Sequence, residues 1–562
     1  MKKFAFILMA AAALFASCTE KEQNGPGSGS GEPLVADFTI STNPCKVGEE
    51  IELKATVSGG VSPYTFTWEL GSEIKLEGQT VKYTFEKNQP YIVKLVVTDA
   101  AGSKVEKRKN LVVNPAPVKE IGNVTLNWAG WVKGYNAIST PAIADDGSVY
   151  ATSQSNILYK FDKEGKLLWE KNFGHSDVSA KTQGTPSIDA DGTVYIGTGT
   201  ANGSGKVMAF NPDGSIKWEF KDFWAPAGST PAPSFQYAIC GIGQENIYFG
   251  NTGTTGSAIA ISKADGKRVA WCQNEAGTGG PGGGVRTGVL ITKDNMLHWY
   301  GGEWGLWGWD KTSVDRAANS GVVWSWGIWN NGDSMDKAIK QANASIAALT
   351  VNGKVCVAGL ATDGYGTKIY AVESKTGEIV CKHYVEDTAE LMDQGGVVVT
   401  KEGYIVAGLN FTNGHDDGGI IIVDPSTEDG RMVARYRVQE KVSGAPAIDA
   451  AGNIHFASEA GQYYVVKLEG NECKLVVKRD LRNLVADDSR YTETFGKLDA
   501  AKVWSSVVIG DDGKVFIQFT NNDSAKLREY GALVCLSVDG CTAPGQTEWP
   551  MMGHDRRHTN AQ

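Results

Sequence analysis

TPAIADDGSVYATS (140–153) and ILYKFDKEGKLLW (157–169) form the stretch that decides the fold. It returns as TPSIDADGTVYIGT with VMAFNPDGSIKW. Related units follow at 230–271, 287–324, 345–381, 395–436, 444–477 and 505–549. Each unit holds four short strands separated by Asp-Gly or Asn-Gly turns, which suit tight hairpins because glycine tolerates positive φ. Four-stranded units at this spacing are typical of propeller blades. Residues 119–562 therefore predict an eight-bladed β-propeller.

The last turn of a unit, with its glycine and the outer-strand tryptophan that follows, resembles the tryptophan-docking motif of PQQ-type (quinoprotein-like) propellers. Trp169, Trp218, Trp271 and Trp324 match it, and Cys381, Tyr436 and Val477 stand at that place in later units. An indole on an outer strand can pack against the neighbouring blade, where aromatic burial is strongly stabilising.

The last blade needs an outer strand from elsewhere in the chain. Leu126-Asn-Trp128 has the pattern of an outer strand without a blade of its own. The tail GQTEWPMMGHDRRHTN (545–560) resembles the Trp-Pro-Met segment that flanks such propellers. We expect one of the two to complete blade eight.

Residues 34–114 predict a second, smaller domain. Apolar residues alternate with polar ones at 51–57, 64–68, 81–85 and 91–97, with Gly- and Asn-containing turns between. Period-two strands within about 80 residues are typical of an immunoglobulin-like sandwich. YTFTWELG and YIVKLVVTDAAG resemble a PKD-type domain, although the family's Gly-Asp-Gly turn after Trp68 is absent. The overall prediction is an all-β chain, a PKD-like sandwich followed by the propeller.

The N-terminus reads as an export signal. In MKKFAFILMAAAALFASC, two lysines precede an apolar run, and small residues lead into Cys18. Residues 1–17 are typical of a signal peptide, and Cys18 resembles the acylated cysteine of bacterial lipoproteins; the alternative is a plain signal peptide. Residues 18–33 are a Gly/Ser-rich flexible tether. We therefore expect a lipid-anchored outer-membrane protein that faces the cell surface.

Net charge, apolar stretches and cysteine spacing exclude several kinds of binding partner. The net charge is 54 − 64 = −10 without a basic run, which argues against nucleic acid. Beyond residue 17 no apolar stretch approaches the roughly 20 residues of a membrane span, so the membrane is expected as a partner only through the anchor. None of the eight later cysteines lies at zinc-ligand spacing, so no metal is expected. Cys535 and Cys541 could pair within one hairpin; most others should be isolated buried thiols.

Catalytic signals are weak. The PQQ-dependent dehydrogenases that share these repeats carry a pair of adjacent cysteines beside the cofactor, and this chain has none. We therefore expect no cofactor and no enzymatic activity. Acidic turns such as 145–147, 189–192 and 511–513 are interpreted as hairpin chemistry rather than calcium loops.

The unusual region is the fourth unit, HWYGGEWGLWGWD (298–310) with VVWSWGIWN (322–330). It holds seven of the sixteen tryptophans. An exposed group of indoles marks a binding surface and can stack on sugar rings. The candidate ligand-binding residues are Trp304, Trp307, Trp326, Trp329, Glu303, Asp310 and Asn330. The alternative is packing, with Trp324 as the docking residue and Trp299 and Trp309 against neighbouring blades.

The sequence thus predicts a non-enzymatic surface lipoprotein that binds a carbohydrate polymer on one propeller face. PKD-plus-propeller lipoproteins resemble the glycan-binding components of bacterial polysaccharide uptake systems. Two alternatives stay open: a protein-interaction scaffold, similar to the propeller lipoprotein of outer-membrane barrel assembly, and a polysaccharide lyase or hydrolase. Insertions at 326–343 and 481–502 are expected to be surface loops that carry specificity.

Overall fold

The computed structural model describes residues 32–71, 74–86, 90–114, 122–134, 139–153, 155–173, 184–198, 205–220, 239–250, 258–272, 288–301, 305–315, 322–325, 339–340, 348–349, 352–361, 367–385, 388–390, 396–411, 418–486, 501–521 and 530–562. The chain divides into two compact units, Met1–Ala116 and Pro117–Gln562. Almost all regular structure in both units is β, as the alternating sequence patterns predict.

The first unit is a β-sandwich. One sheet has the order β1-β3-β6 and the other β2-β8-β7-β4-β5. The strands are β1 (Val35–Ile40), β2 (Cys45–Lys46), β3 (Glu50–Ser58), β4 (Thr65–Leu70), β5 (Ile74–Glu77), β6 (Thr80–Thr84), β7 (Pro90–Thr98) and β8 (Lys104–Asn114). Trp68 is fully buried between the sheets, where its ring meets Phe38 edge-on at 5.1 Å between centroids. The predicted sandwich is confirmed.

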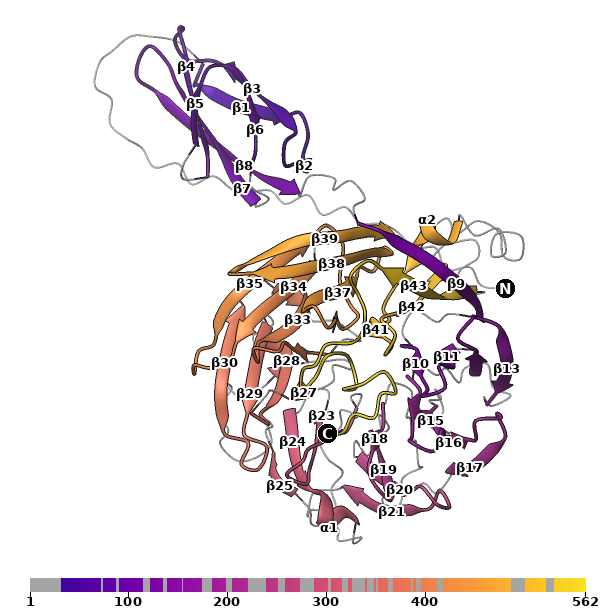
Figure 1. Ribbon diagram of the computed structural model, residues 1–562. Helices are drawn as coiled ribbons and strands as arrows, with labels where there is room; N and C mark the ends of the chain where they lie inside the picture. Colours follow the sequence, from indigo (N-terminus) through magenta and orange to yellow (C-terminus); the bar gives the residue numbers. More distant parts are fainter. Residues whose placement is uncertain are drawn as a thin grey trace, which may run out of the picture. The chain divides into compact units, whose positions relative to one another are not determined.

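The second unit is a β-propeller whose sheets are arranged around an axis (Figure 1). Its described residues form eight sheets, each with a four-strand antiparallel path, which we call blades 1 to 8 in chain order. Blade 1 contains β10 (Ala142–Ile143), β11 (Val149–Ser153), β12 (Ile157–Phe161) and β13 (Leu167–Asn172), and blade 2 contains β14 (Ser187–Ile188), β15 (Val194–Gly197), β16 (Val207–Phe210) and β17 (Ile216–Phe220). Blade 3 contains β18 (Gly241–Ile242), β19 (Asn246–Gly250), β20 (Ala258–Ser262) and β21 (Arg268–Cys272), and blade 4 contains β22 (Leu290–Ile291), β23 (Met296–Gly301), β24 (Gly305–Asp310) and β25 (Val322–Ser325).

Blade 5 contains β27 (Ala348–Leu349), β28 (Val355–Ala361), β29 (Thr367–Val372) and β30 (Ile379–Val385), and blade 6 contains β32 (Val398–Val399), β33 (Ile405–Phe411), β34 (Gly418–Asp424) and β35 (Arg431–Val438). Blade 7 contains β36 (Ala447–Ile448), β37 (Asn453–Ala457), β38 (Gln462–Glu469) and β39 (Glu472–Asp480), and blade 8 contains β41 (Val508–Ile509), β42 (Val515–Asn521), β43 (Tyr530–Val538) and β9 (Val124–Lys133). Short strands β26 (Ile339–Lys340), β31 (Thr388–Glu390) and β40 (Ala501–Lys502) add to blades 5, 6 and 8.

Strand β9 closes the ring. It pairs with β43 along its whole length, from Lys133 opposite Tyr530 to Val124 opposite Val538. Of the two segments that the sequence offers as the outer strand of blade 8, the N-terminal one therefore fills that place. The C-terminal segment runs through the middle of the ring instead (Figure 1).

Hydroxyl groups at the start of the innermost strands connect neighbouring blades. The Thr185 hydroxyl accepts the backbone N–H of Thr140 at 3.1 Å, and the Thr140 hydroxyl accepts that of Ser506 at 3.0 Å. The Ser506 hydroxyl in turn accepts the N–H of Ala445 at 2.9 Å. Because buried backbone donors need partners, the Thr-Pro and Ser-Ser dipeptides of the repeat join blade 7 to blades 8, 1 and 2 in sequence.

Two expectations about insertions are corrected. Ile339 and Lys340, predicted to lie in a surface loop, form β26 and pair with Ala361 and Leu360 of β28. The segment after β39 begins with helix α2 (Leu481–Ala486), which buries Leu481 and one further apolar side chain. Helices α2 and α1 (Lys311–Asp315) are six and five residues long, far below the roughly 20 residues of a membrane span.

Candidate functional site

The propeller has two chemically different ends. In each blade, the meander places the first-to-second and third-to-fourth strand turns at one end, which we call the turn face, for example 144–148 and 162–166 in blade 1. The remaining connections leave from the opposite end, which we call the connection face, for example 173–186 and 221–240. Most connections on the turn face are short; an exception is residues 311–321 of blade 4, which begin with α1.

The C-terminal segment, residues 544–562, is an integral part of the turn face. Its carbonyl groups accept the backbone N–H of the second innermost-strand residue in six blades, at 2.8–3.0 Å. The donor and acceptor pairs are Ile143 with Arg556, Ile188 with Arg557, Ile242 with Thr559, Ile291 with Asn560, Val399 with Trp549, and Ile448 with Pro550. The segment therefore satisfies the free edges of the innermost strands, which an open sheet would otherwise expose.

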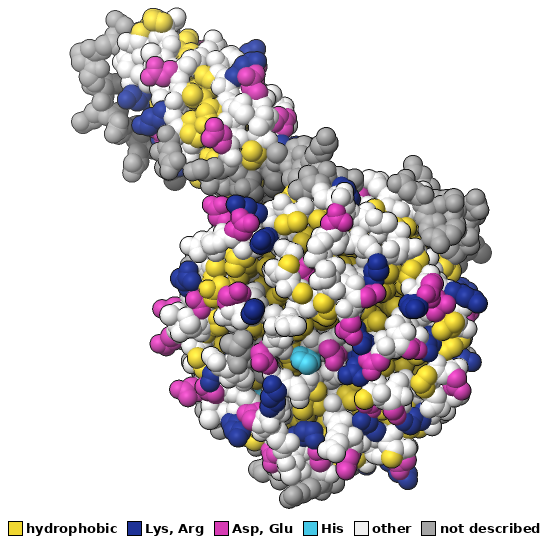
Figure 2. Space-filling view, viewed as in Figure 1, with side chains coloured by type: hydrophobic (Ala, Val, Ile, Leu, Met, Phe, Trp, Pro, Cys, Tyr) yellow, Lys and Arg dark blue, Asp and Glu magenta, His cyan; other side chains and the backbone are white. Residues whose placement is uncertain are grey.

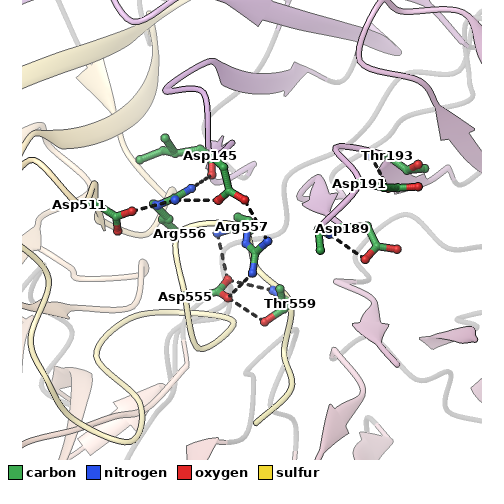
Figure 3. A network of polar contacts seen from close by, with 11 residues as sticks. Asp145, Asp189, Asp191, Thr193, Asp511, Asp555, Arg556, Arg557 and Thr559 are labelled. Atoms are coloured by element: carbon green, nitrogen blue, oxygen red, sulfur yellow. Dashed lines mark hydrogen bonds and ion pairs between the residues drawn. The ribbon is translucent and has the colours of Figure 1, made fainter. Parts of the chain in front are cut away.

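Two arginines fix this segment to the acidic turns (Figure 3). The Arg556 guanidinium lies 2.8 Å from a carboxylate oxygen of Asp145 in blade 1 and 2.7 Å from one of Asp511 in blade 8. Arg557 reaches the other Asp145 oxygen at 3.5 Å. Asp555 accepts the backbone N–H of Arg557 at 3.0 Å. These acidic turns thus bind the chain's own cations.

The other acidic residues of the turns serve the turns themselves. Asp146, Asp191 and Asp512 each accept the backbone N–H two residues further on, at 2.8–3.1 Å. This is the local hydrogen bond that favours aspartate in tight turns. The interpretation of these carboxylates as turn chemistry is confirmed.

Tryptophan docking connects blades at their rims. The indole N–H groups of Trp169 and Trp218 donate to the carbonyls of Pro212 and Lys263 in the next blade, at 3.1 and 3.0 Å. Trp128 of β9 does the same toward Lys163. The docking role of Trp128 was missed in the sequence because the strand stands before the first repeat. The side chains of Trp271 and Trp324 lie outside the described part of the chain.

The tryptophans of blade 4 fall into two groups: those that pack in the core and those that are candidates for ligand binding. Trp299 and Trp309 are at most 3% exposed and stack at 5.3 Å between ring centroids, so they are core. Trp304, Trp326, Trp329, Glu303 and Asn330 lie outside the described residues, as does Cys18. Trp307 belongs to β24, opposite Trp299 and Ser325 in register; its side chain is not described.

Asp310 is separated from the other candidates. Its carboxylate accepts the backbone N–H of Thr312 at 3.0 Å and the Ser313 hydroxyl at 2.9 Å, so it caps α1 on the turn face. Gly305, where β24 begins, lies at the connection face. Five strand steps of about 3.3 Å place Asp310 about 17 Å from that end. Asp310 therefore has a structural role at the opposite end of the strand.

The turn face also holds two cavities, each between neighbouring blades. One, of about 560 Å³, lies between blades 4 and 5 and is lined by Lys293, Asp294, Glu373, Ser374 and the tail residue Glu548, among others. The other, of about 580 Å³, lies between blades 8 and 1. Its lining includes acidic turn residues, Trp128 and Arg556. Acidic and basic side chains are interspersed over the propeller (Figure 2), so neither sign of charge dominates this surface.

A pyrroloquinoline quinone cofactor, which the fold suggests, does not fit the residues present. Cys535 and Cys541 are free thiols that form no disulfide with each other, and no two cysteines are adjacent in the chain. On the turn face, Met551, Met552, His558 and Asn560 of the tail are at most 3% exposed. The adjacent cysteine pair of the PQQ-dependent dehydrogenases is thus absent from the sequence, and the tail covers one end of the axis (Figure 1).

The comparisons identify the class of both units. Residues 37–113 match the PKD domain family, and residues 128–313 match the family described as outer membrane protein assembly factor BamB. The chain therefore combines a PKD domain with a PQQ-like β-propeller. A search of curated proteins found no match.

Two solved dehydrogenase structures agree with this chain in fold, and a BamB structure is also among the matches. Quinohemoprotein alcohol dehydrogenase from Comamonas testosteroni is 10% identical, with 76% of this chain and 78% of that chain covered and a TM-score of 0.53. The enzyme ADHIIG from Pseudomonas putida HK5 is 14% identical, with 77% and 80% covered and a TM-score of 0.53. BamB from Moraxella catarrhalis is 12% identical, with 74% and 100% covered and a TM-score of 0.46. The likeness to the two dehydrogenases, at a TM-score of 0.53, concerns the fold alone.

Proposed function

We propose that the chain is a non-enzymatic lipoprotein, anchored in the outer membrane through Cys18, whose propeller binds a carbohydrate polymer at the connection face of blade 4. The indoles of Trp304, Trp307, Trp326 and Trp329 stack on sugar rings, while Glu303 and Asn330 accept and donate hydrogen bonds to hydroxyl groups. Aromatic faces with nearby polar groups are suited to sugars because a sugar ring has an apolar face and a polar rim.

One observation carries this proposal. Gly301 and Gly305 pair at the connection-face end of β23 and β24. Ser325, the last residue of β25, pairs with Trp307 near the same end. The segments that bear Trp304, Trp326 and Trp329 therefore leave the blade from one end. Trp299 and Trp309 already pack in the core of this blade.

Affinity electrophoresis against a panel of polysaccharides tests the site. The native chain should be retarded by one class of polymer without changing that polymer's size. Alanine at Trp304, Trp307, Trp326 and Trp329 together should abolish the retardation. Ile216→Ala is a matched control, because Ile216 is an exposed apolar side chain (58%) on an outer strand of another blade. Retention unchanged in the quadruple variant would refute the proposed site, and shortening of the polymer would indicate a lyase or hydrolase.

The anchor is tested separately. Cells that express the chain are fed an alkyne-tagged fatty acid, which should label the native protein and leave a Cys18→Ala variant unlabelled. Equal labelling of both would refute the anchor without affecting the glycan proposal.

A protein-interaction scaffold is the second candidate. The match of residues 128–313 to the family described as outer membrane protein assembly factor BamB supports it. Affinity purification from cross-linked outer membranes distinguishes the two candidates. Recovery of a barrel-assembly protein, together with no retardation by any polysaccharide, would favour the scaffold.

A further inference from the structure

Three potential metal ligands from two blades meet at the junction of blades 7 and 8. Asp449 follows β36, His455 lies in β37, and Cys541 follows β43 of blade 8. One ligand atom from each lies within 4.8 Å of those from the other two. Asp449 and His455 are 1% and 0% exposed, whereas Cys541 is half-buried and so gives access from the surface. Their separation in sequence explains why spacing rules predicted no metal here.

Hydrogen bonds orient the aspartate and histidine toward each other. His455 Nε2 lies 3.0 Å from Asp449 Oδ2, while His455 Nδ1 lies 2.6 Å from the hydroxyl of Tyr463. Asp449 Oδ1 accepts the backbone N–H groups of Ala451 and Asn453. The Asn453 side chain donates to Asp449 Oδ2 at 2.9 Å. Outer partners of this kind hold imidazole and carboxylate ligands in metal sites.

The repeat offers an internal comparison for the buried carboxylate. Asp189 occupies the position of Asp449 in blade 2, and it too bonds an aromatic residue of the next strand, the Tyr195 hydroxyl at 3.2 Å. There the Lys263 ammonium of blade 3 lies 2.7 Å from the carboxylate and compensates its charge. Among the described residues, no lysine or arginine forms an ion pair with Asp449; the group there that can carry a positive charge is the His455 imidazole, 3.0 Å away. A bound cation would add the charge that Lys263 supplies to Asp189 in blade 2.

We propose that Asp449 Oδ2, His455 Nε2 and Cys541 Sγ bind one zinc ion that ties blade 7 to blade 8. Carboxylate oxygen, imidazole nitrogen and thiolate sulfur are all ligands of zinc, and bonds of about 2.0–2.1 Å in a tetrahedron place N and O about 3.3 Å apart. The observed N···O distance of 3.0 Å needs only a small adjustment. The three ligand atoms, within 4.8 Å of one another, must draw together until a zinc–sulfur bond of about 2.3 Å forms. Zinc takes the place of the proton between His455 Nε2 and Asp449 Oδ2; the imidazole keeps one proton on Nδ1, toward the Tyr463 hydroxyl. The thiol proton and any second imidazole proton pass to solvent, and a water or another small donor completes four-coordination.

Cobalt titration of the chelator-treated full chain tests the site, because a cobalt–thiolate bond produces an intense charge-transfer absorption. We expect this absorption to saturate at one equivalent and to be abolished by stoichiometric zinc. Cys541→Ser should remove it. Cys473→Ser is the control, since Cys473 is another half-buried free thiol of blade 7. Zinc should also raise the denaturation midpoint of the native propeller and leave that of Cys541→Ser unchanged.

Three results would overturn the proposal. The first is a native chain without thiolate absorption, and this test stands even if Cys541→Ser does not fold. The second is absorption that persists in a folded Cys541→Ser variant. The third is absorption lost equally in Cys473→Ser, which would place the cobalt at that other thiol.

Discussion

Replacing Trp549 by alanine should destabilise the propeller strongly, although the residue stands 13 positions from the chain's last residue. Trp549 is fully buried and packs in the apolar cluster of blades 4 to 6, and its carbonyl accepts the N–H of Val399 at 2.9 Å. A buried tryptophan removes about 200 Å² from water, worth about 5 kcal/mol at 25 cal/mol per Å². Measured Trp→Ala changes in cores cost about 3–5 kcal/mol. We therefore expect a loss of about 4 kcal/mol.

Urea denaturation followed by near-ultraviolet circular dichroism measures this loss, with the two units fitted as separate transitions because a two-unit chain need not unfold in one step. Trp549→Phe should cost less than half as much. It keeps most of the apolar volume and removes an indole N–H that has no hydrogen-bond partner among the described residues. Trp68→Ala should instead weaken only the sandwich. A propeller transition that shifts by less than about 1 kcal/mol in Trp549→Ala would refute the conclusion that the tail belongs to the core.

Two further changes test the blade contacts and the tail. Gly266→Ala should destabilise the propeller by about 1–3 kcal/mol more than Gly452→Ala in the same denaturation assay. Both glycines have positive φ, but only at Gly266 would a Cβ lie 2.5 Å from the Trp218 indole; equal losses would contradict tight docking. Burial lowers the pKa of His558 to about 4 from its ordinary 6.5. The unfolded chain therefore gains its proton first as pH falls, and stability is lost between pH 6.5 and 4, by up to about 3 kcal/mol. His558→Asn should flatten this pH profile, and an unchanged profile would assign the pH dependence to other groups.

The sequence predicts the architecture well because repeated local chemistry specifies it. Asp-Gly turns, alternating strands and the docking positions Trp169 and Trp218 recur often enough to reveal the blade, and each does locally what its pattern indicates. The sequence does not decide which of two segments supplies the outer strand of blade 8, because both have aromatic and apolar residues. Only pairing distinguishes them: β9 pairs with β43 from end to end with one register shift, whereas the tail offers its carbonyls to one donor per blade in six blades.

Sites that depend on distant residues are beyond such reasoning. Asp145 and Asp511 are 366 positions apart, yet both bind Arg556. Asp449, His455 and Cys541 meet only because blades 7 and 8 are neighbours. In blade 4, by contrast, residues close in sequence lie far apart in the structure. Sequence proximity suggested that Asp310 belongs with the tryptophans, but an antiparallel strand carries residues five positions apart to opposite ends of the blade.

The two faces of the propeller differ in how many of their backbone N–H and C=O groups already form hydrogen bonds within the protein. On the turn face, short hairpins satisfy their own hydrogen bonds and the tail accepts the innermost N–H groups of six blades. A ligand that approached the axis there would have to displace buried contacts of Trp549, Met552 and His558, at a cost of several kcal/mol. On the connection face, the connections outside β26, β31 and β40 can change without breaking the strand pairing described for the blades. Variation in ligand specificity is therefore least costly on the connection face, from which the tryptophan-bearing segments of blade 4 leave.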